Sequence, residues 1–171
     1  PKDWAPVSPT GLVVHDTLTA RMAPRMAIPA LAAAVAALGG VFAAEAEDEG
    51  CVVWATGAAG LGEMSQIVGK TVGVPVKGQS ALLAHDARRL PQLFAGGVHI
   101  VPHANGTVAI GSTTEREFDD PTGCDDQLDH VIAAARAACP VLVDAPVIDR
   151  WAGLRPRSKT RAPMLGAWPA R

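Results

Sequence analysis

The dipeptide Asn105-Gly106 is the feature of this sequence that most constrains its fold. It lies between two apolar runs, residues 97–102 and 107–114. Both residues of such a pair accept a positive φ, which the tightest hairpin turns require. The sequence therefore predicts a β-hairpin here, and with it antiparallel strands in this part of the chain.

Three further segments extend that prediction. Residues 73–83 and 147–154 are apolar runs with the length and composition of strands. Residues 125–139 carry apolar side chains at helical spacing, and Pro140 follows where a helix should end. We expect residues 67–160 to form an antiparallel sheet that carries a helix.

The preceding part of the chain has a different pattern. Residues 10–20 are rich in Val and Thr and predict a short strand. Pro24 opens an alanine-rich stretch that predicts a helix over 24–38, because proline is tolerated in a first turn and alanine is the best helix former. The apolar segments 41–46 and 51–56 predict two short buried strands beside it. This order indicates part of an α/β layer.

The fold class that follows is α/β, of the α+β kind, with the α/β layer interleaved with the antiparallel sheet. We place the layer at residues 15–66, the sheet at 67–160 and a return segment at 161–171. The uncharged run 26–44 is long enough for a membrane helix, but it is mostly alanine and Gly39-Gly40 interrupts it. We expect no membrane span, no signal peptide and a cytoplasmic location.

Charge and cysteine content exclude several classes of function. The 171 residues carry 15 Lys and Arg against 17 Asp and Glu, a formal charge of -2. A chain this close to neutral does not indicate binding to nucleic acid or to an anionic membrane. Cys51, Cys124 and Cys139 have a spacing that fits neither a disulfide framework nor a tetrahedral zinc site. We expect reduced thiols and no bound metal.

Arg155 is the first candidate for a binding residue. It follows Gly153 at the end of an apolar strand and precedes Pro156, so its guanidinium is expected at a defined strand end. A planar fork of donors in such a place suits the capture of a carboxylate. The alternative is a structural ion pair with Asp144 or Asp149, and residue chemistry alone favours that alternative.

Six separated stretches carry a resemblance to one family. They are, in chain order, Val52-Val53-Trp54-Ala55-Thr56-Gly57, Val74-Pro75-Val76-Lys77-Gly78-Gln79, His99-Ile100-Val101-Pro102, Gly111-Ser112-Thr113-Thr114-Glu115, Trp151-Ala152-Gly153-Leu154-Arg155-Pro156 and Pro163-Met164-Leu165-Gly166. Together they resemble the glycine oxidase and D-amino-acid oxidase family across most of residues 15–166. Each stretch alone is weak evidence, whereas the ordered set is specific.

The resemblance implies FAD as cofactor and oxidation of the C–N bond of a small amino acid or amine, of the glycine or D-amino-acid type, to an imine. In such enzymes the flavin does the chemistry and the protein positions the substrate. Arg155 matches the family's arginine that binds the substrate carboxylate. His99 stands where relatives often place a pocket tyrosine, and this chain has no tyrosine. An ordinary strand histidine is the alternative for His99.

The resemblance also implies contacts to FAD. Ala55, Thr56 and Gly57 would approach the flavin or its adenosine portion, with a tight turn as their alternative role. The stretch Lys77-Gly78-Gln79 matches the start of the cap sheet, which nears the flavin in relatives; Gly78 could instead mark a bulge. No residue is given a direct catalytic role. The carboxylates of Glu63, Glu115, Glu117, Asp119 and Asp120 are expected to be solvated.

The flavin-binding fingerprint of the family, Gly-x-Gly-x-x-Gly after a strand, does not occur here. The nearest stretch, residues 57–62, has the wrong spacing, and no glycine-rich segment follows Arg155. We therefore expect an interior piece of a larger parent enzyme that lacks both terminal flavin-binding segments and binds FAD weakly by itself. Apolar surface left uncovered predicts self-association. The alternative is a non-redox domain that binds a small carboxylate or a partner protein.

Overall fold

The computed structural model describes residues 2–169. The chain divides into two compact units, one of residues 15–53 and one of the remaining residues. The larger unit contains the 3-10 helices η1 (Lys2–Trp4) and η2 (Pro140–Leu142), the helices α2 (Gly57–Ile67) and α3 (Asp126–Ala138), and the strands β1 (Gly73–Ala84), β2 (Leu93–Ala95), β3 (Val98–Pro102), β4 (Thr107–Gly111) and β5 (Val147–Ser158). Each unit is described separately below.

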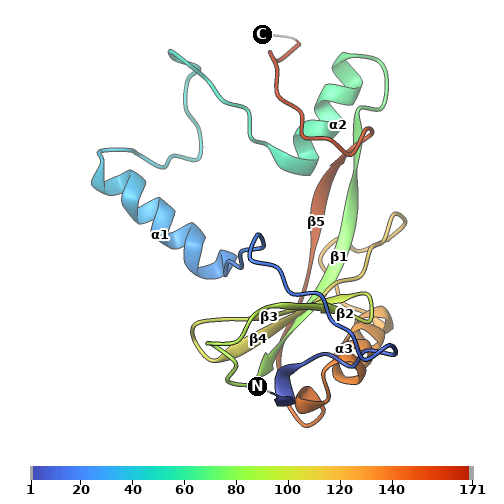
Figure 1. Ribbon diagram of the computed structural model, residues 1–171. Coiled ribbons are helices and arrows are strands. Elements are labelled where there is room, and N and C mark those ends of the chain that lie inside the picture. The colour runs from blue at the N-terminus through green and yellow to red at the C-terminus, as the bar shows by residue number, and fades with distance from the viewer. Residues whose placement is uncertain (1, 170–171) are drawn as a thin grey trace. The chain divides into compact units, whose positions relative to one another are not determined.

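The larger unit is built on a five-stranded antiparallel sheet in the order β2-β3-β4-β1-β5 (Figure 1). The predicted hairpin is confirmed: β3 pairs with β4, and Gly106 in the turn has a φ of 82°. Strand β5 runs to Ser158, four residues beyond the predicted end, because it pairs with β1 along the full length of both strands. The short edge strand β2 was not predicted.

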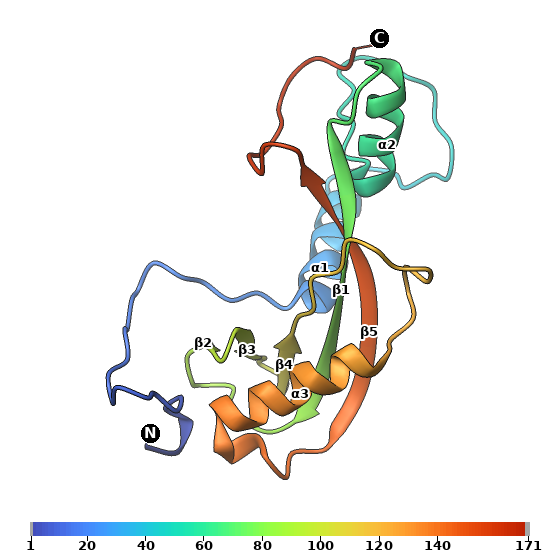
Figure 2. The same cartoon turned by 90° about the vertical axis from the view of Figure 1, so that its right-hand side faces the viewer.

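Helix α3 covers one face of the sheet (Figure 2). It begins after Asp125, whose carboxylate caps the helix by accepting a hydrogen bond from the backbone N–H of Gln127 at 2.9 Å. Its apolar residues are buried at helical spacing, as predicted. They pack on the side chains that alternate strand residues direct toward the helix, which are Ala81, Leu83, Val98, Ile100, Val108 and Ile110.

The opposite face of the sheet is here called the outer face. It carries the strand residues that alternate in sequence with the residues facing the core. Paired residues of antiparallel strands direct their side chains to the same face. The register therefore places on the outer face Val76, Gly78 and Ser80 of β1, His99 of β3, Gly111 of β4, and Trp151, Gly153 and Arg155 of β5. Arg155 and His99, far apart in sequence, thus share one face.

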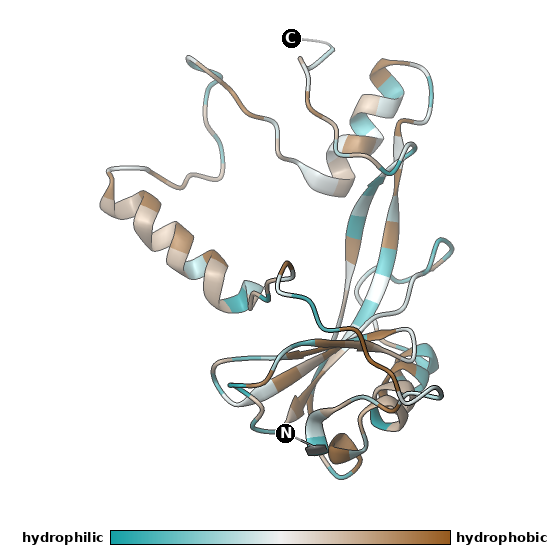
Figure 3. Ribbon diagram, viewed as in Figure 1, coloured by the Kyte–Doolittle hydropathy of each residue, from teal (hydrophilic) through white to brown (hydrophobic). Residues whose placement is uncertain are grey.

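The smaller unit, His15–Val53, contains one helix, α1 (Pro24–Ala37). It forms where the sequence predicts a helix and ends before Gly39, which has a φ of 87°. Apolar residues lie along the whole helix (Figure 3), and none of them is buried. No helix among the described residues is long and apolar enough to cross a membrane.

Three predicted strands are not formed. Residues 10–20, 41–46 and 51–56 adopt no regular β structure. A strand needs a neighbour to satisfy its backbone N–H and C=O groups, and no strand of the described residues pairs with these segments. Their apolar side chains are accordingly exposed rather than buried, as at Val41 (86%) and Val53 (86%). The boundaries predicted at residues 66 and 160 stay predictions.

Candidate binding face

Arg155 extends from β5 across the neighbouring strand β1. It is paired with Val76, and its guanidinium reaches over the next outer-face position of β1 to the segment that follows β4. There Nη2 donates to the carbonyl oxygen of Thr113 at 2.6 Å, and Nη1 donates to Oγ of Ser112 at 3.3 Å. A longer bond of 3.5 Å joins Nη2 to the carbonyl oxygen of Lys77. These bonds fix the guanidinium on the outer face.

This path is open because residue 78 is glycine. A Cβ atom at Gly78 would lie 2.2 Å from Nη2 and 2.8 Å from Cζ of Arg155, closer than nonbonded atoms approach. Its cross-strand partner Gly153 differs, since a Cβ atom there would have no neighbour within 4 Å. Gly78 lies within continuous β1–β5 pairing, so the bulge considered as its alternative role is not present there.

The guanidinium retains donors for a ligand. It has five N–H groups, and the three bonds above use only part of them. Those partners are uncharged oxygens rather than the carboxylates of Asp144 or Asp149. The side chain is exposed although it is fixed. A positive charge held in place by neutral acceptors suits an anionic ligand better than one neutralised by an ion pair.

His99 lies on the same face, two strands away from β1. It pairs with Gly111, which in turn pairs with Ser80 of β1. Its ring packs on Phe94 of β2, with 4.7 Å between the ring centroids and 41° between the planes. The outer face thus has Arg155 at one side and an exposed imidazole at the other.

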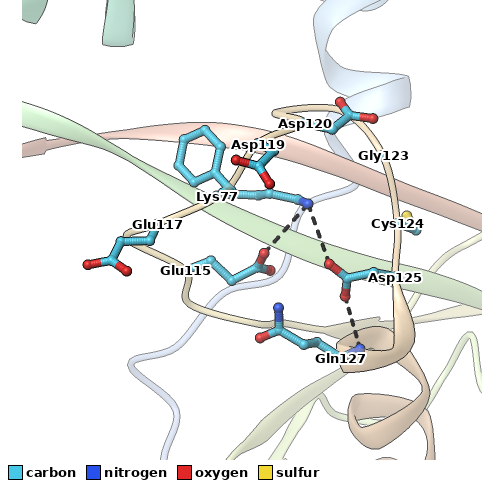
Figure 4. A pocket seen from close by; sticks show the side chains of 10 residues that line it. Lys77, Glu115, Glu117, Asp119, Asp120, Gly123, Cys124, Asp125 and Gln127 are labelled. Carbon is cyan, nitrogen blue, oxygen red and sulfur yellow. Dashed lines mark hydrogen bonds and ion pairs between the residues drawn. The ribbon is translucent and has the colours of Figure 1, made fainter.

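Lys77 and Gln79 point to the opposite side, toward α3. Both side chains are buried, with exposures of 3% and 0%. Nζ of Lys77 lies 3.5 Å from Glu115 and 3.8 Å from Asp125 (Figure 4). The side-chain amide of Gln79 donates to both of those carboxylates, at 3.0 and 2.8 Å. Their side chains therefore serve a buried network, and only their backbone atoms border the outer face.

Among the carboxylates that were expected to be solvated, Glu115 is the one for which the prediction is wrong. It is 7% exposed instead of solvated. Its backbone N–H and carbonyl pair with the carbonyl and N–H of Lys77, each at 2.9 Å. Its carboxylate accepts hydrogen bonds from Thr113 Oγ1 and Gln79. Residues 111–115 form one of the six stretches that resemble the family, but the charge of a glutamate does not indicate whether its carboxylate is buried or solvated.

Beside this network lies an open pocket of about 320 Å³. It is lined by Lys77, Glu115, Glu117, Phe118, Asp119, Asp120, Gly123, Cys124, Asp125 and Gln127 (Figure 4). Its wall is acidic, while its one ammonium already has carboxylate partners. In the described part of the chain no group of three or more His, Cys, Asp or Glu side chains could hold a metal ion.

The pKa of Asp125 is held below its ordinary value, mainly by the hydrogen bond from Gln79, then by the N–H of Gln127 and by the nearby ammonium of Lys77. Because folding lowers this pKa, the ionised carboxylate stabilises the fold at pH values above the pKa of an aspartate in the unfolded chain, about 3.9. That stabilisation is lost as the pH falls through the lower pKa of the folded state. We expect the free energy of unfolding, measured with urea, to fall less on acidification below pH 5 in Asp125→Asn than in the wild type. An equal fall in Asp125→Asn and in the wild type would contradict this prediction.

The stretch Ala55-Thr56-Gly57 opens helix α2 rather than ending a strand. Thr56 is its N-cap residue, and Gly57 has a φ of 60°. Ala55 and Thr56 are exposed. In residues 2–169 no hydrogen bond, ion pair or ring contact joins this stretch to Arg155 or His99. The register thus places Arg155, Gly78 and His99 on one face of the sheet, with Arg155 directly over Gly78 and His99 two strands away from β1, and residues 55–57 lie outside that face.

Comparison with known proteins gives a consistent result. The chain matches the family described as DAO, FAD dependent oxidoreductase, over residues 2–170. It is 35% identical to glycine oxidase of Pseudomonas aeruginosa over 132 residues, 76% of this chain and 36% of that protein. It is 38% identical to glycine oxidase of Pseudomonas putida over 96 residues, 56% of this chain and 26% of that protein.

A solved structure is similar as well. The crystal structure of glycine oxidase from Geobacillus kaustophilus aligns with a TM-score of 0.60 at 30% identity, over 78% of this chain and 35% of that chain. The mixed helix and antiparallel-sheet fold is therefore shared with that structure. The chain spans about a quarter to a third of the length of these relatives.

Proposed function

Because the chain belongs to the DAO family of FAD-dependent oxidoreductases, we propose that its outer face binds the substrate of a flavoenzyme of amine oxidation. The substrate is a small amino acid or amine of the glycine or D-amino-acid type, and the product is an imine. FAD is the cofactor named in the description of the family. The similar proteins named above are glycine oxidases, which supports a small substrate.

The observation that carries the proposal is the placement of Arg155. Its guanidinium is fixed by the Thr113 carbonyl and the Ser112 hydroxyl, without a carboxylate partner in these bonds. A substrate carboxylate can therefore supply the negative charge. Since the guanidinium is already oriented, little conformational entropy is lost on binding. Arg155 would hold the substrate by its carboxylate, and His99 would border the same site.

The residues fit a flavin in one respect. At Gly153 a Cβ atom would have no neighbour within 4 Å, so the outer face is open there and a flat ring can approach the backbone beside the Arg155 guanidinium. The stretch Lys77-Gly78-Gln79 would offer backbone atoms there, and Ala55-Thr56-Gly57 would contact another part of the cofactor. The flavin, when bound, accepts the hydride from the substrate carbon. The protein's own residues bind and orient the substrate.

Titration of the chain with glycolate, a small carboxylate, tests the Arg155 site. We expect Arg155→Ala to weaken binding roughly 10- to 100-fold, because a hydrogen bond to a charged group contributes about 1.5–3 kcal/mol. Isothermal titration calorimetry measures the affinity. Arg150→Ala is the matched control: Arg150 lies in the same strand but is paired with Asp129 at 2.7 Å. Equal affinities of wild type and Arg155→Ala would contradict the proposal.

The second candidate function is binding of a small carboxylate without redox chemistry. The guanidinium of Arg155, fixed by the uncharged oxygens of Thr113 and Ser112, can hold a carboxylate without a flavin, which favours this candidate. Visible absorption after addition of FAD and removal of free cofactor separates the two. Retained flavin that glycine or a D-amino acid bleaches supports the redox function. Glycolate binding without retained flavin supports the second.

We further propose a cytoplasmic location, since Cys51, Cys124 and Cys139 are free thiols.

Large apolar side chains are exposed in both units, for example Leu31 at 66% and Phe94 at 68%. Such surface favours self-association into a homo-oligomer or contact with the rest of a longer protein. We keep residues 15–66 as part of a flavin-binding layer, 67–160 as the substrate-binding cap and 161–171 as the return segment.

A further inference from the structure

We propose that Glu115 is a positioning residue for Arg155: its buried carboxylate fixes the Thr113 segment whose carbonyl orients the guanidinium. This inference rests on the proposed role of Arg155 in carboxylate binding. Glu115 itself does not touch Arg155, because its side chain lies on the α3 side of the sheet.

Backbone hydrogen bonds hold the segment after β4 against β1. Strand β4 pairs with β1 as far as Gly111. Beyond it, the N–H of Thr113 donates to the Gln79 carbonyl at 3.3 Å, and Glu115 exchanges two backbone hydrogen bonds of 2.9 Å with Lys77. The segment therefore lies along β1, directly beside Gly78.

The Glu115 carboxylate lies at the centre of the buried network. It accepts hydrogen bonds from the Thr113 hydroxyl and from the Gln79 amide, the latter at 3.0 Å, and it lies 3.5 Å from the ammonium of Lys77. All four side chains are at least nine-tenths buried. A buried charge is retained only where it is paired and hydrogen-bonded. One carboxylate thus connects three groups of the buried network.

Thr113 links this network to the outer face. On the α3 side its hydroxyl is bonded to Glu115 and accepts from the backbone N–H of Gln79 at 2.8 Å. On the outer face its carbonyl accepts the shortest bond of Arg155, 2.6 Å. A shift of Thr113 therefore moves the acceptor that orients the guanidinium. Lys77 adds to the coupling, because its carbonyl oxygen also accepts from Arg155.

The test uses the chain itself and needs no ligand. Bonds that restrict the guanidinium slow rotation about its Cζ–Nη bonds, so nitrogen NMR of wild type should resolve separate Nη signals for Arg155, identified by comparison with Arg155→Lys. In Glu115→Gln and in Thr113→Val these signals should merge. The controls are Glu117→Gln and Thr114→Val, which alter exposed neighbours in the same segment. Both should keep the wild-type pattern, and Thr113→Ser, which retains the hydroxyl, should keep it as well.

The nearly isosteric Thr113→Val keeps the proposal falsifiable if Glu115→Gln fails to fold, and the backbone amide spectrum reports folding. A folded Thr113→Val with unchanged Arg155 signals would overturn the proposal. A glycolate titration separates this failure from failure of the proposed function. Lack of glycolate binding by wild type refutes the proposed function, while the Nη signals still decide the role of Glu115. If the wild type binds glycolate, we expect Thr113→Val to weaken that binding about tenfold. The same substitution added to Arg155→Ala should not weaken binding further.

Discussion

Replacing Gly78 by alanine is expected to weaken carboxylate binding, at most to the extent of the roughly 10- to 100-fold loss expected for Arg155→Ala. The added methyl group would stand where the guanidinium now lies, 2.2 Å from Nη2. The guanidinium of Arg155 must then shift away from Gly78, which disturbs its bonds to Thr113 and Ser112. Calorimetric titration with glycolate measures the change in affinity.

Gly153 offers a matched control for this experiment. It is the cross-strand partner of Gly78, yet a methyl group there meets no atom within 4 Å. Gly153→Ala should leave both the fold and the position of Arg155 unchanged, with an affinity close to that of wild type. Equal affinities of Gly78→Ala and Gly153→Ala would show that the path of Arg155 across β1 is irrelevant to binding.

Leu83→Ala is expected to reduce the free energy of unfolding by about 2–5 kcal/mol. Leu83 lies in β1 with 0% exposure, among the residues that contact α3. Truncation removes apolar contacts and leaves a cavity that neighbouring strands cannot close without breaking their pairing. Urea unfolding followed by circular dichroism gives the change, read from the midpoint at constant slope.

The control for the core is Leu12→Ala, because that side chain is 79% exposed. Its effect should lie within about 0.5 kcal/mol. A loss of less than 1 kcal/mol for Leu83→Ala would mean that the sheet and α3 do not form a common core.

The part of the fold that local signals specify could be predicted from the sequence. The Asn105-Gly106 turn fixes the β3–β4 hairpin. The spacing of apolar residues and the following Pro140 fix α3. Alanine and a first-turn proline fix α1. Each of these depends on neighbours in the chain rather than on distant partners.

Features that depend on distant partners were harder to predict. Residues 41–46 and 51–56 have the composition of strands, but a strand forms only where another strand pairs with it. Glycine-rich residues 57–67 form α2 although glycine disfavours helices. Tertiary contacts outweigh propensity there, since Leu61 of α2 packs close to Gly73 of β1.

The candidate site was predicted in part. Arg155 and His99 were chosen from the resemblance to a family, and the register of the sheet places both on the outer face. Their role in binding stays a prediction. The contacts of Ser112, Thr113 and Glu115 could not be foreseen, because they depend on how the chain continues beside β1 after β4. Burial of a carboxylate is a property of that arrangement and not of its neighbours in sequence.

The most direct test of the account is a nitrogen–proton NMR titration of the isotope-labelled chain with glycolate. If glycolate binds at Arg155, the shifts should saturate and cluster at Arg155 and at Gly78, Ser112 and Thr113, which surround its guanidinium. In Arg155→Ala the same shifts should be absent. Saturating shifts that cluster instead at the acidic pocket of residues 117–125, or none at all, would contradict the account.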